Sequence, residues 1–173
     1  MNISEQRQKG LDFSLRYRRD FSFGDLTFTS RVSHILDHTQ QNFPDSDPDV
    51  INDQTGNPET VGNSQIRFDR GDWTVFYDVD WASAASDDRF FANGNATTFY
   101  GEPVFARYSV DNYFLHSMTV RRQMNDFTFV VGIRNLFDEN APQVTNGFLG
   151  NGAYGSQYDY FGRQLILSLS KDF

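Results

Sequence analysis

The sequence contains no cysteine, no long apolar run and no excess of positive charge, and each absence excludes a class of protein or site. Without cysteine the chain has neither disulfide bonds nor a thiolate metal site. No window approaches the roughly 18 continuous apolar residues of a transmembrane helix, so no such helix is expected. The net charge of -8 argues against nucleic-acid binding, because the phosphate backbone requires a basic surface. Residues 1–20 are basic and lack an apolar segment, so no signal peptide is expected there.

Aromatic residues are abundant, although the average residue is polar. They make up 16% of the chain, while the mean hydropathy is -0.58. These values are compatible if apolar residues occupy alternate positions of strands and the loops are hydrophilic. The clearest alternation places Trp73, Val75, Tyr77, Val79 and Trp81 on one parity. The two tryptophans lie about 26 Å apart along a strand, a spacing that suits two aromatic girdles at membrane interfaces.

The final stretch, residues 163–173, has the same two-residue period. Leu165, Leu167, Leu169 and Phe173 share one parity, and polar residues occupy most of the other. This pattern predicts a strand that ends on an aromatic residue. It resembles the closing strand of a bacterial outer-membrane β-barrel, in which the apolar parity faces lipid and the other parity faces the lumen.

Seven strands are predicted from such alternation, joined by connections of two kinds. The strands cover residues 10–18, 26–36, 64–68, 73–81, 107–121, 127–134 and 163–173. Short turns near residues 21–25, 69–72 and 123–126 alternate with long polar loops at residues 37–63, 82–106 and 138–161. Outer-membrane barrels have short periplasmic turns and long extracellular loops, whereas sandwiches mix connection lengths at both ends. The sequence therefore predicts an all-β fold, one domain over residues 1–173 that forms part of an antiparallel transmembrane β-barrel with a periplasmic C-terminus.

Asn112 and His116 are the polar exceptions on the apolar parity of the fifth predicted strand, and His116 raises the sharper question. It falls near the middle of the membrane, where a polar side chain on the lipid face is costly. Either the parity shifts at a β-bulge, or a neighbouring element covers the imidazole.

A series of short motifs near the C-terminus resembles the barrel of TonB-dependent outer-membrane receptors. That family typically carries an apolar strand ending in Asn-Leu-Phe-Asp, a proline a few residues later, a Tyr-Asp or similar pair before Gly-Arg, and a last strand ending in Phe. This chain has these pieces in that order, at Asn135, Leu136, Phe137, Asp138, Pro142, Tyr158, Asp159, Gly162, Arg163 and Phe173. The resemblance is specific over residues 104–173 and rests on strand and loop rhythm over residues 1–103. The family's usual apolar residue two before the end is replaced by Lys171, whose ammonium can reach water at the membrane rim.

The resemblance implies a barrel of about 22 strands with an N-terminal plug and a short box that contacts TonB. None of that N-terminal apparatus is expected in this chain, and seven strands leave two edges whose backbone groups would be unsatisfied in lipid. We therefore expect a C-terminal barrel portion in the outer membrane. Its partners would be membrane lipid, the missing N-terminal strands and plug, and TonB indirectly through the plug.

The function that the resemblance implies is uptake of a scarce ligand, such as a ferric siderophore, cobalamin or a glycan. The extracellular loops and the plug would bind it, and TonB would pull on the plug to admit it. Candidate contacts are the aromatic residues of the long loops, namely Phe90, Phe91, Phe99, Tyr100, Phe148, Tyr154 and Tyr158. The alternative is that these aromatics form the outer interfacial girdle or pack loop against loop.

No metal, cofactor or catalytic site is expected. Asp45, Asp47 and Asp49 have the opening spacing of a calcium loop, but the required glycine and closing glutamate are missing. His34 and His38 are four residues apart outside any helix, and the glycine-rich stretch of the third loop lacks the lysine of a phosphate-binding loop. An enzyme is not expected. The other readings are a different outer-membrane barrel, such as a porin or an adhesin, or a soluble β-sandwich that binds carbohydrate.

Overall fold

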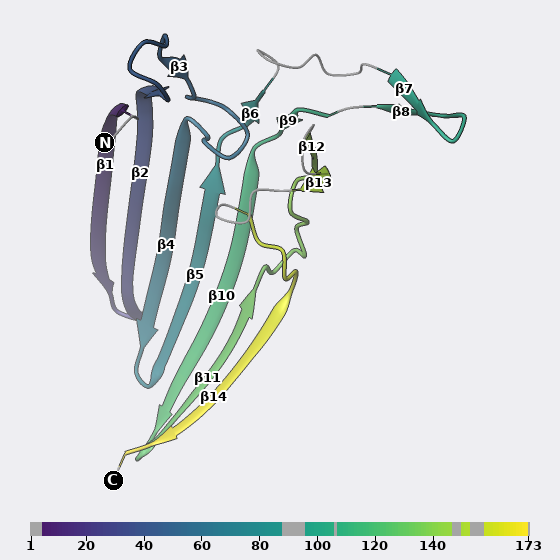
Figure 1. Cartoon of the computed structure of the whole chain (residues 1–173). Helices are drawn as coiled ribbons and strands as arrows, with labels where there is room; N and C mark the ends of the chain where they lie inside the picture. The colour runs from purple at the N-terminus through teal and green to yellow at the C-terminus, as the bar shows by residue number, and fades with distance from the viewer. Residues whose placement is uncertain (1–4, 88–95, 106, 147–149, 153–157, 173) are drawn as a thin grey trace.

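The computed structural model describes residues 5–87, 96–105, 107–146, 150–152 and 158–172, and seven long strands dominate this part of the chain (Figure 1). They are β1 (Glu5–Phe21), β2 (Gly24–Gln41), β4 (Thr60–Arg70), β5 (Trp73–Ala82), β10 (Tyr113–Met124), β11 (Phe127–Arg134) and β14 (Gln164–Lys171). Each pairs antiparallel with the next, in the order β1-β2-β4-β5-β10-β11-β14. The predicted antiparallel all-β fold is therefore confirmed. No described residue belongs to a helix that could span a membrane.

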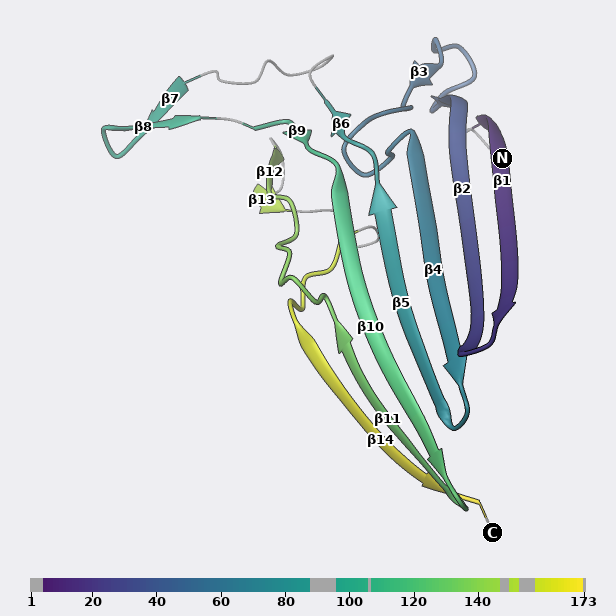
Figure 2. The ribbon, with the colours of Figure 1, turned by 180° about the vertical axis from the view of Figure 1, so that it is seen from behind.

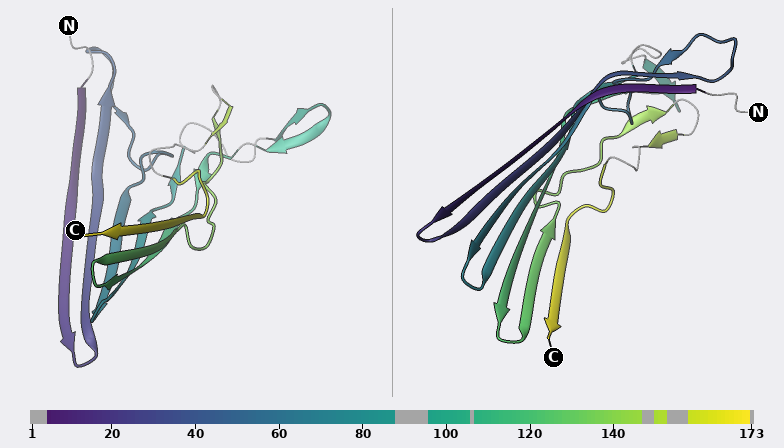
Figure 3. Two further views of the ribbon diagram at one scale, coloured as in Figure 1. Left: turned by 90° about the horizontal axis from the view of Figure 1, so that it is seen from below. Right: turned by 90° about the vertical axis from the view of Figure 1, so that its left-hand side faces the viewer.

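The sheet is curved and open (Figure 3). Among the described residues, β1 and β14 each pair with one long strand only, so each leaves one edge of its backbone without a partner strand. The alternating pattern of the sequence accounts for the extended conformation, and the twist of antiparallel strands accounts for the curvature.

The two ends of the sheet differ in their connections. At one end, which we call the turn end, two residues join each of β1 to β2, β4 to β5 and β10 to β11. Gly71 and Asn125 have φ values of 53° and 51°, in the left-handed region that tight hairpins require. At the other end, the loop end, the connections are long. The predicted alternation of short turns and long loops is thus confirmed.

Several short strands lie at the loop end of the sheet (Figure 2). β3 (Asp49–Val50) extends the main sheet by pairing with β2. The other short strands form three two-stranded pairs: β6 (Ala85–Ser86) with β9 (Ser109–Val110), β7 (Ala96–Phe99) with β8 (Glu102–Phe105), and β12 (Val144–Asn146) with β13 (Gly150–Gly152). No alternation in the sequence predicted them, because strands of two to four residues are too short to show a period.

Four predicted strand boundaries were wrong by four residues or more. The first strand begins at Glu5 and not at residue 10, and the second ends at Gln41 and not at residue 36. The third strand begins at Thr60 and not at residue 64, because the Trp81 indole fills the space above Gly62, which has no side chain of its own. The strand that contains His116 begins at Tyr113 and not at residue 107, because the preceding residues leave the main sheet: Asn112 Oδ1 accepts a hydrogen bond of 2.8 Å from the Ala84 amide.

The two faces of the sheet have opposite character. On β14, Leu165, Leu167 and Leu169 lie on one face and are 66%, 70% and 61% exposed. A soluble sandwich would cover such a face with a second sheet, whereas the described residues form one large sheet with this face open. We call it the apolar face. The opposite, polar face carries the buried cluster of Ala85, Val110, Tyr113, Leu115, Val144 and Tyr158, which lies at the loop end.

Two pairs of polar side chains lie on the apolar face in the middle part of the sheet. Ser30 and Ser64 lie opposite each other on β2 and β4, with their hydroxyl oxygens 3.0 Å apart. His116 Nδ1 lies 2.8 Å from the Tyr77 hydroxyl, and the Phe137 ring packs edge-on against the imidazole with centroids 4.9 Å apart. The register of β10 against β5 is continuous, so neighbouring side chains cover His116 and no bulge moves it.

Candidate ligand-facing site at the loop end

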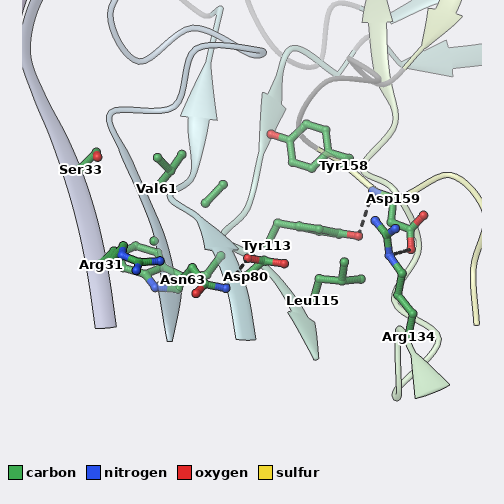
Figure 4. Close-up of a pocket in the computed structure, with 13 residues that line it drawn as sticks. Arg31, Ser33, Val61, Asn63, Asp80, Tyr113, Leu115, Arg134, Tyr158 and Asp159 are labelled. Carbon is green, nitrogen blue, oxygen red and sulfur yellow. Dashed lines mark hydrogen bonds and ion pairs between the residues drawn. The ribbon is translucent and has the colours of Figure 1, made fainter. Parts of the chain in front are cut away.

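A cavity of about 520 Å³ lies on the polar face beneath the long loops (Figure 4). Its walls come from five neighbouring strands and the loop that precedes β14. The lining residues are Arg31, Ser33, Val61, Gly62, Asn63, Asp80, Trp81, Ala82, Tyr113, Leu115, Arg134, Tyr158 and Asp159. Residues that are remote in the sequence therefore share one surface.

Strand register explains how this surface forms. Arg31 lies opposite Asn63, Asn63 lies opposite Asp80, and Asp80 lies opposite Leu115. The adjacent row runs from Ser33 through Val61 and Ala82 to Tyr113. Because side chains alternate between faces along each strand, both rows point to the polar face.

The floor of the cavity combines the amide of Asn63, the carboxylate of Asp80 and the guanidinium of Arg31, and Asp78 lies next to it outside the lining. Asn63 Nδ2 donates to Asp80 Oδ1 at 2.7 Å and to Asp78 Oδ1 at 2.9 Å. Arg31 makes no hydrogen bond or ion pair with another described residue, so its five N–H donors face the cavity and solvent. This floor offers both charged donors and charged acceptors to a polar ligand.

The opposite wall is formed by Tyr158 and Asp159. The Tyr158 ring packs edge-on against Tyr113 with centroids 5.1 Å apart, and the Tyr113 hydroxyl accepts a hydrogen bond from the Asp159 amide at 3.3 Å. The Asp159 side chain is 1% exposed, and its Oδ2 lies 3.5 Å from Arg134 Nε. These contacts hold the end of the third long loop against the polar face.

Tyr158 has a buried hydroxyl that makes no hydrogen bond with a described residue. Burial, with a smaller effect of the neighbouring Tyr113, raises the pKa of the Tyr158 phenol, which therefore stays neutral at physiological pH. A neutral phenol can donate one hydrogen bond and accept others.

At the end of β11, the Asn-Leu-Phe-Asp segment contacts residues that follow it and residues that precede β14. We call the group Asn135, Asp138, Glu139, Gly162 and Arg163 the clasp. Asn135 is fully buried, and its side chain bonds both backbone groups of Glu139: Nδ2 donates to the carbonyl at 2.8 Å, and Oδ1 accepts from the amide at 2.7 Å. Asp138 Oδ1 accepts a hydrogen bond of 2.9 Å from the Arg163 amide. The start and the end of the third long loop are thereby joined.

Backbone conformation fits these residue types. Asn135 and Asp138 have φ values of 55° and 58°, in the left-handed region that Asn and Asp tolerate better than most residues. Gly162 has a φ of 66°, and a Cβ there would lie 3.3 Å from Asp138 Oδ1. Leu136 and Phe137 tie the clasp to β10, because the Leu136 amide donates to the His116 carbonyl at 2.7 Å and the Phe137 ring covers the His116 imidazole.

The aromatic ligand-contact candidates do not converge on one site in the described part of the chain. Tyr158 lines the cavity, while Tyr100 is 95% exposed in the connection between β7 and β8, which Figure 1 shows extending away from the main sheet. Phe99 belongs to β7. Phe90, Phe91, Phe148 and Tyr154 lie outside the described residues, as does Phe173 of the family motif.

Most cavity residues were missed by the sequence reasoning. Arg31 and Asp80 lie on the polar parity of predicted strands, so their alternation was a usable signal, whereas Asn63 fell in the first predicted loop. The pairing of these three residues across strands was not visible in the sequence. In the described ranges, no group of three or more His, Cys, Asp or Glu side chains is placed to hold a metal ion.

Comparison with known proteins agrees with this geometry. A family model described as the β-barrel of TonB-dependent receptor-like proteins matches residues 1–136. The match includes residues 1–103, for which the resemblance rested only on the alternation of strands and loops. It ends at Leu136, inside the Asn-Leu-Phe-Asp segment. No curated protein and no solved structure matches the chain significantly. The matched share of the chain shows that it belongs to the TonB-dependent receptor-like β-barrel family, a family of outer-membrane receptors and transporters.

Proposed function

We propose that this chain forms part of the barrel wall of a TonB-dependent receptor that takes up a scarce ligand of the siderophore, cobalamin or glycan class. The polar cavity at the loop end carries the proposal, because it combines hydroxyl, amide, carboxylate and guanidinium groups on the face that would line the lumen. The short turns would face the periplasm, together with the C-terminus, and the long loops would face the cell exterior.

The two unpaired edges of the sheet support the idea that the chain is the C-terminal portion of a larger barrel. In lipid, the free backbone groups of β1 and β14 each require a neighbouring strand, since an open edge costs several kcal/mol per unsatisfied group. Further barrel strands of the same receptor would supply those partners, a plug would fill the lumen, and TonB would act through the plug.

Uptake by the complete receptor tests this function. We would measure uptake of labelled cyanocobalamin, a ferric tris-catecholate and an oligosaccharide by cells that express the receptor with or without its TonB-contacting box. We expect uptake of one probe, lost on deleting the box. Uptake that survives the deletion would indicate a passive porin, and binding to host surfaces without any uptake would indicate an adhesin.

A matched pair of substitutions tests the cavity. Arg31→Gln removes an arginine from the cavity, and Arg16→Gln removes an arginine of the same face that lies at the turn end. We expect R31Q to raise the half-saturating concentration of the transported probe at least severalfold, and R16Q to leave it unchanged. Equal effects of the two variants would contradict a role for the cavity.

A further inference from the structure

Cationic side chains cluster on the apolar face at the turn end. Arg19, Arg70, Arg122 and Lys171 continue the apolar parity of β1, β4, β10 and β14. We call these four cations and the aromatic residues beside them, Phe21, Trp73 and Phe127, the basic rim. Together they lie at the border of the surface that faces lipid.

Three of these cations stack on aromatic rings. The Arg122 guanidinium carbon lies 4.7 Å from the Trp73 ring centroid, that of Arg19 lies 5.1 Å from Phe21, and the Lys171 ammonium lies 5.6 Å from Phe127. Arg70 and Arg122 both lie opposite Trp73 in the register, on the strands to either side of it. Stacking holds these cations along the surface of the sheet.

Two arginines on the polar face near the same end have acidic partners. Arg67 pairs with Asp69 at 2.7 Å, and Arg18 lies 3.2 Å from Asp20 and 3.8 Å from Asp25. No described carboxylate lies within ion-pair distance of Arg19, Arg70 or Arg122, and Arg19 and Arg122 lie over aromatic rings instead.

Three further acidic residues of the turn end lie beyond the strand ends. Asp72 and Asp126 are in the tight turns, and Asp172 follows β14. Their backbones tie the hairpins together, because the Asp72 carbonyl accepts from Gln123 and the Asp126 carbonyl accepts from Asp172. In the described part of the chain, no ion pair links these three carboxylates to the rim arginines.

Position in the bilayer indicates what would supply that charge. The rim follows directly on the apolar stripe, so its guanidinium groups lie at the depth of lipid headgroups, with aromatic rings at the interface. Arginine binds phosphate through a planar fork of donors. We propose that the basic rim binds the phosphate groups of anionic phospholipids, phosphatidylglycerol or cardiolipin, in the membrane leaflet at the turn end. This inference depends on membership of the outer-membrane family and not on which ligand is transported.

Lipid retention by the complete receptor tests the proposal. The receptor would be purified in neutral detergent containing equal amounts of phosphatidylglycerol and phosphatidylcholine, and native mass spectrometry would count the bound lipids. The test variant is R70Q/R122Q, and R70K/R122K keeps the charge. The matched control is R16Q/R121Q, which removes two arginines from the polar face and so changes the net charge equally.

We expect wild type and R70K/R122K to retain phosphatidylglycerol over phosphatidylcholine, and R70Q/R122Q to lose roughly tenfold of that preference, since each cation near an anionic surface contributes severalfold in affinity. The control R16Q/R121Q should behave as wild type. Equal losses in the test and control variants, an unchanged R70Q/R122Q, or selective retention of lipopolysaccharide in its place would overturn the proposal.

Salt dependence of the wild-type receptor provides a measurement that requires no variant to fold. Raising the salt concentration to about 0.5 M shortens the range of electrostatic attraction to a few ångströms. Retention of phosphatidylglycerol should then fall towards that of phosphatidylcholine. Retention that does not respond to salt would also overturn the proposal.

Discussion

Replacing Asn135 by alanine should loosen the clasp that joins the two ends of the third long loop. The substitution removes the hydrogen bonds of 2.7 and 2.8 Å to the Glu139 backbone, from a side chain with no exposed surface. Each such bond contributes roughly 0.5–1.5 kcal/mol. Alanine at a φ of 55° adds about 1 kcal/mol of backbone strain that asparagine tolerates better. The expected total is about 2–4 kcal/mol.

Two further variants separate the components of this cost. Asn135→Gly relieves the backbone strain and deletes the same two hydrogen bonds, so we expect about 1–3 kcal/mol. Asn125→Ala is the matched control, because Asn125 has a φ of 51° in a tight turn and its side chain makes no recorded hydrogen bond. Only the strain of about 1 kcal/mol should remain there.

The assay should report on the loop as well as on the whole barrel. Limited proteolysis of the complete receptor in vesicles measures how readily the segment 138–163 is cleaved. The midpoint of urea unfolding measures the stability of the whole barrel. We expect N135A to be cleaved fastest, N135G next, and N125A at nearly the wild-type rate. Equal resistance of N135A and N125A to the protease would show that the two hydrogen bonds to Glu139 do not stabilise the closed loop, which would refute this prediction.

Three other contacts give expected outcomes of their own. A Cβ on Gly62 would lie 2.3 Å from Trp81 Nε1, so G62V should displace the indole and lower the free energy of unfolding by about 1–3 kcal/mol, with a shift in tryptophan emission; W81L in the same background should remove that added cost. S30A or S64A alone should each lower the free energy of unfolding by about 1 kcal/mol, because each leaves one hydroxyl on the apolar face without its partner. The double variant should lose less than the sum of the two, and strict additivity in urea unfolding would contradict the pairing. R134M should loosen the loop before β14 by about 1–2 kcal/mol and speed its proteolysis, because the Asp159 carboxylate, which is 1% exposed, loses its cation. Adding D159N to R134M should restore resistance to the protease.

The long strands were predictable because the alternation of apolar and polar side chains that specifies a strand can be read within one stretch of sequence. In β5 the apolar residues repeat every second position, and the same period in β14 placed its leucines on the exposed apolar face. The tight turns followed from glycine, asparagine and aspartate between two such runs. Prediction failed at Gly62, where the side chain that completes the pattern belongs to Trp81 on the neighbouring strand.

The candidate site was harder to predict because its information is distributed across strands. The Asn135 to Asp138 segment is contiguous, so it could be recognised along the chain, and its contacts hold a loop. The cavity is instead a product of register, since Arg31, Asn63 and Asp80 become neighbours only when three strands pair at one offset. A shift of one residue in any of these strands would turn its side chain to the apolar face.

The two ends of the sheet use the same alternation for different purposes. At the loop end, the polar parity collects the charged groups of the cavity, and buried contacts such as Tyr113 with Tyr158 hold a loop over it. At the turn end, Arg18 and Arg67 of the polar parity pair with carboxylates, whereas the apolar parity ends in arginines that stack on aromatic rings. In the two roles we propose, another molecule would balance these charges: a transported ligand at the loop end and lipid phosphate at the turn end. Arg31 and Arg122 are the residues through which these two roles can be separated, because each can be changed without touching the contacts of the other.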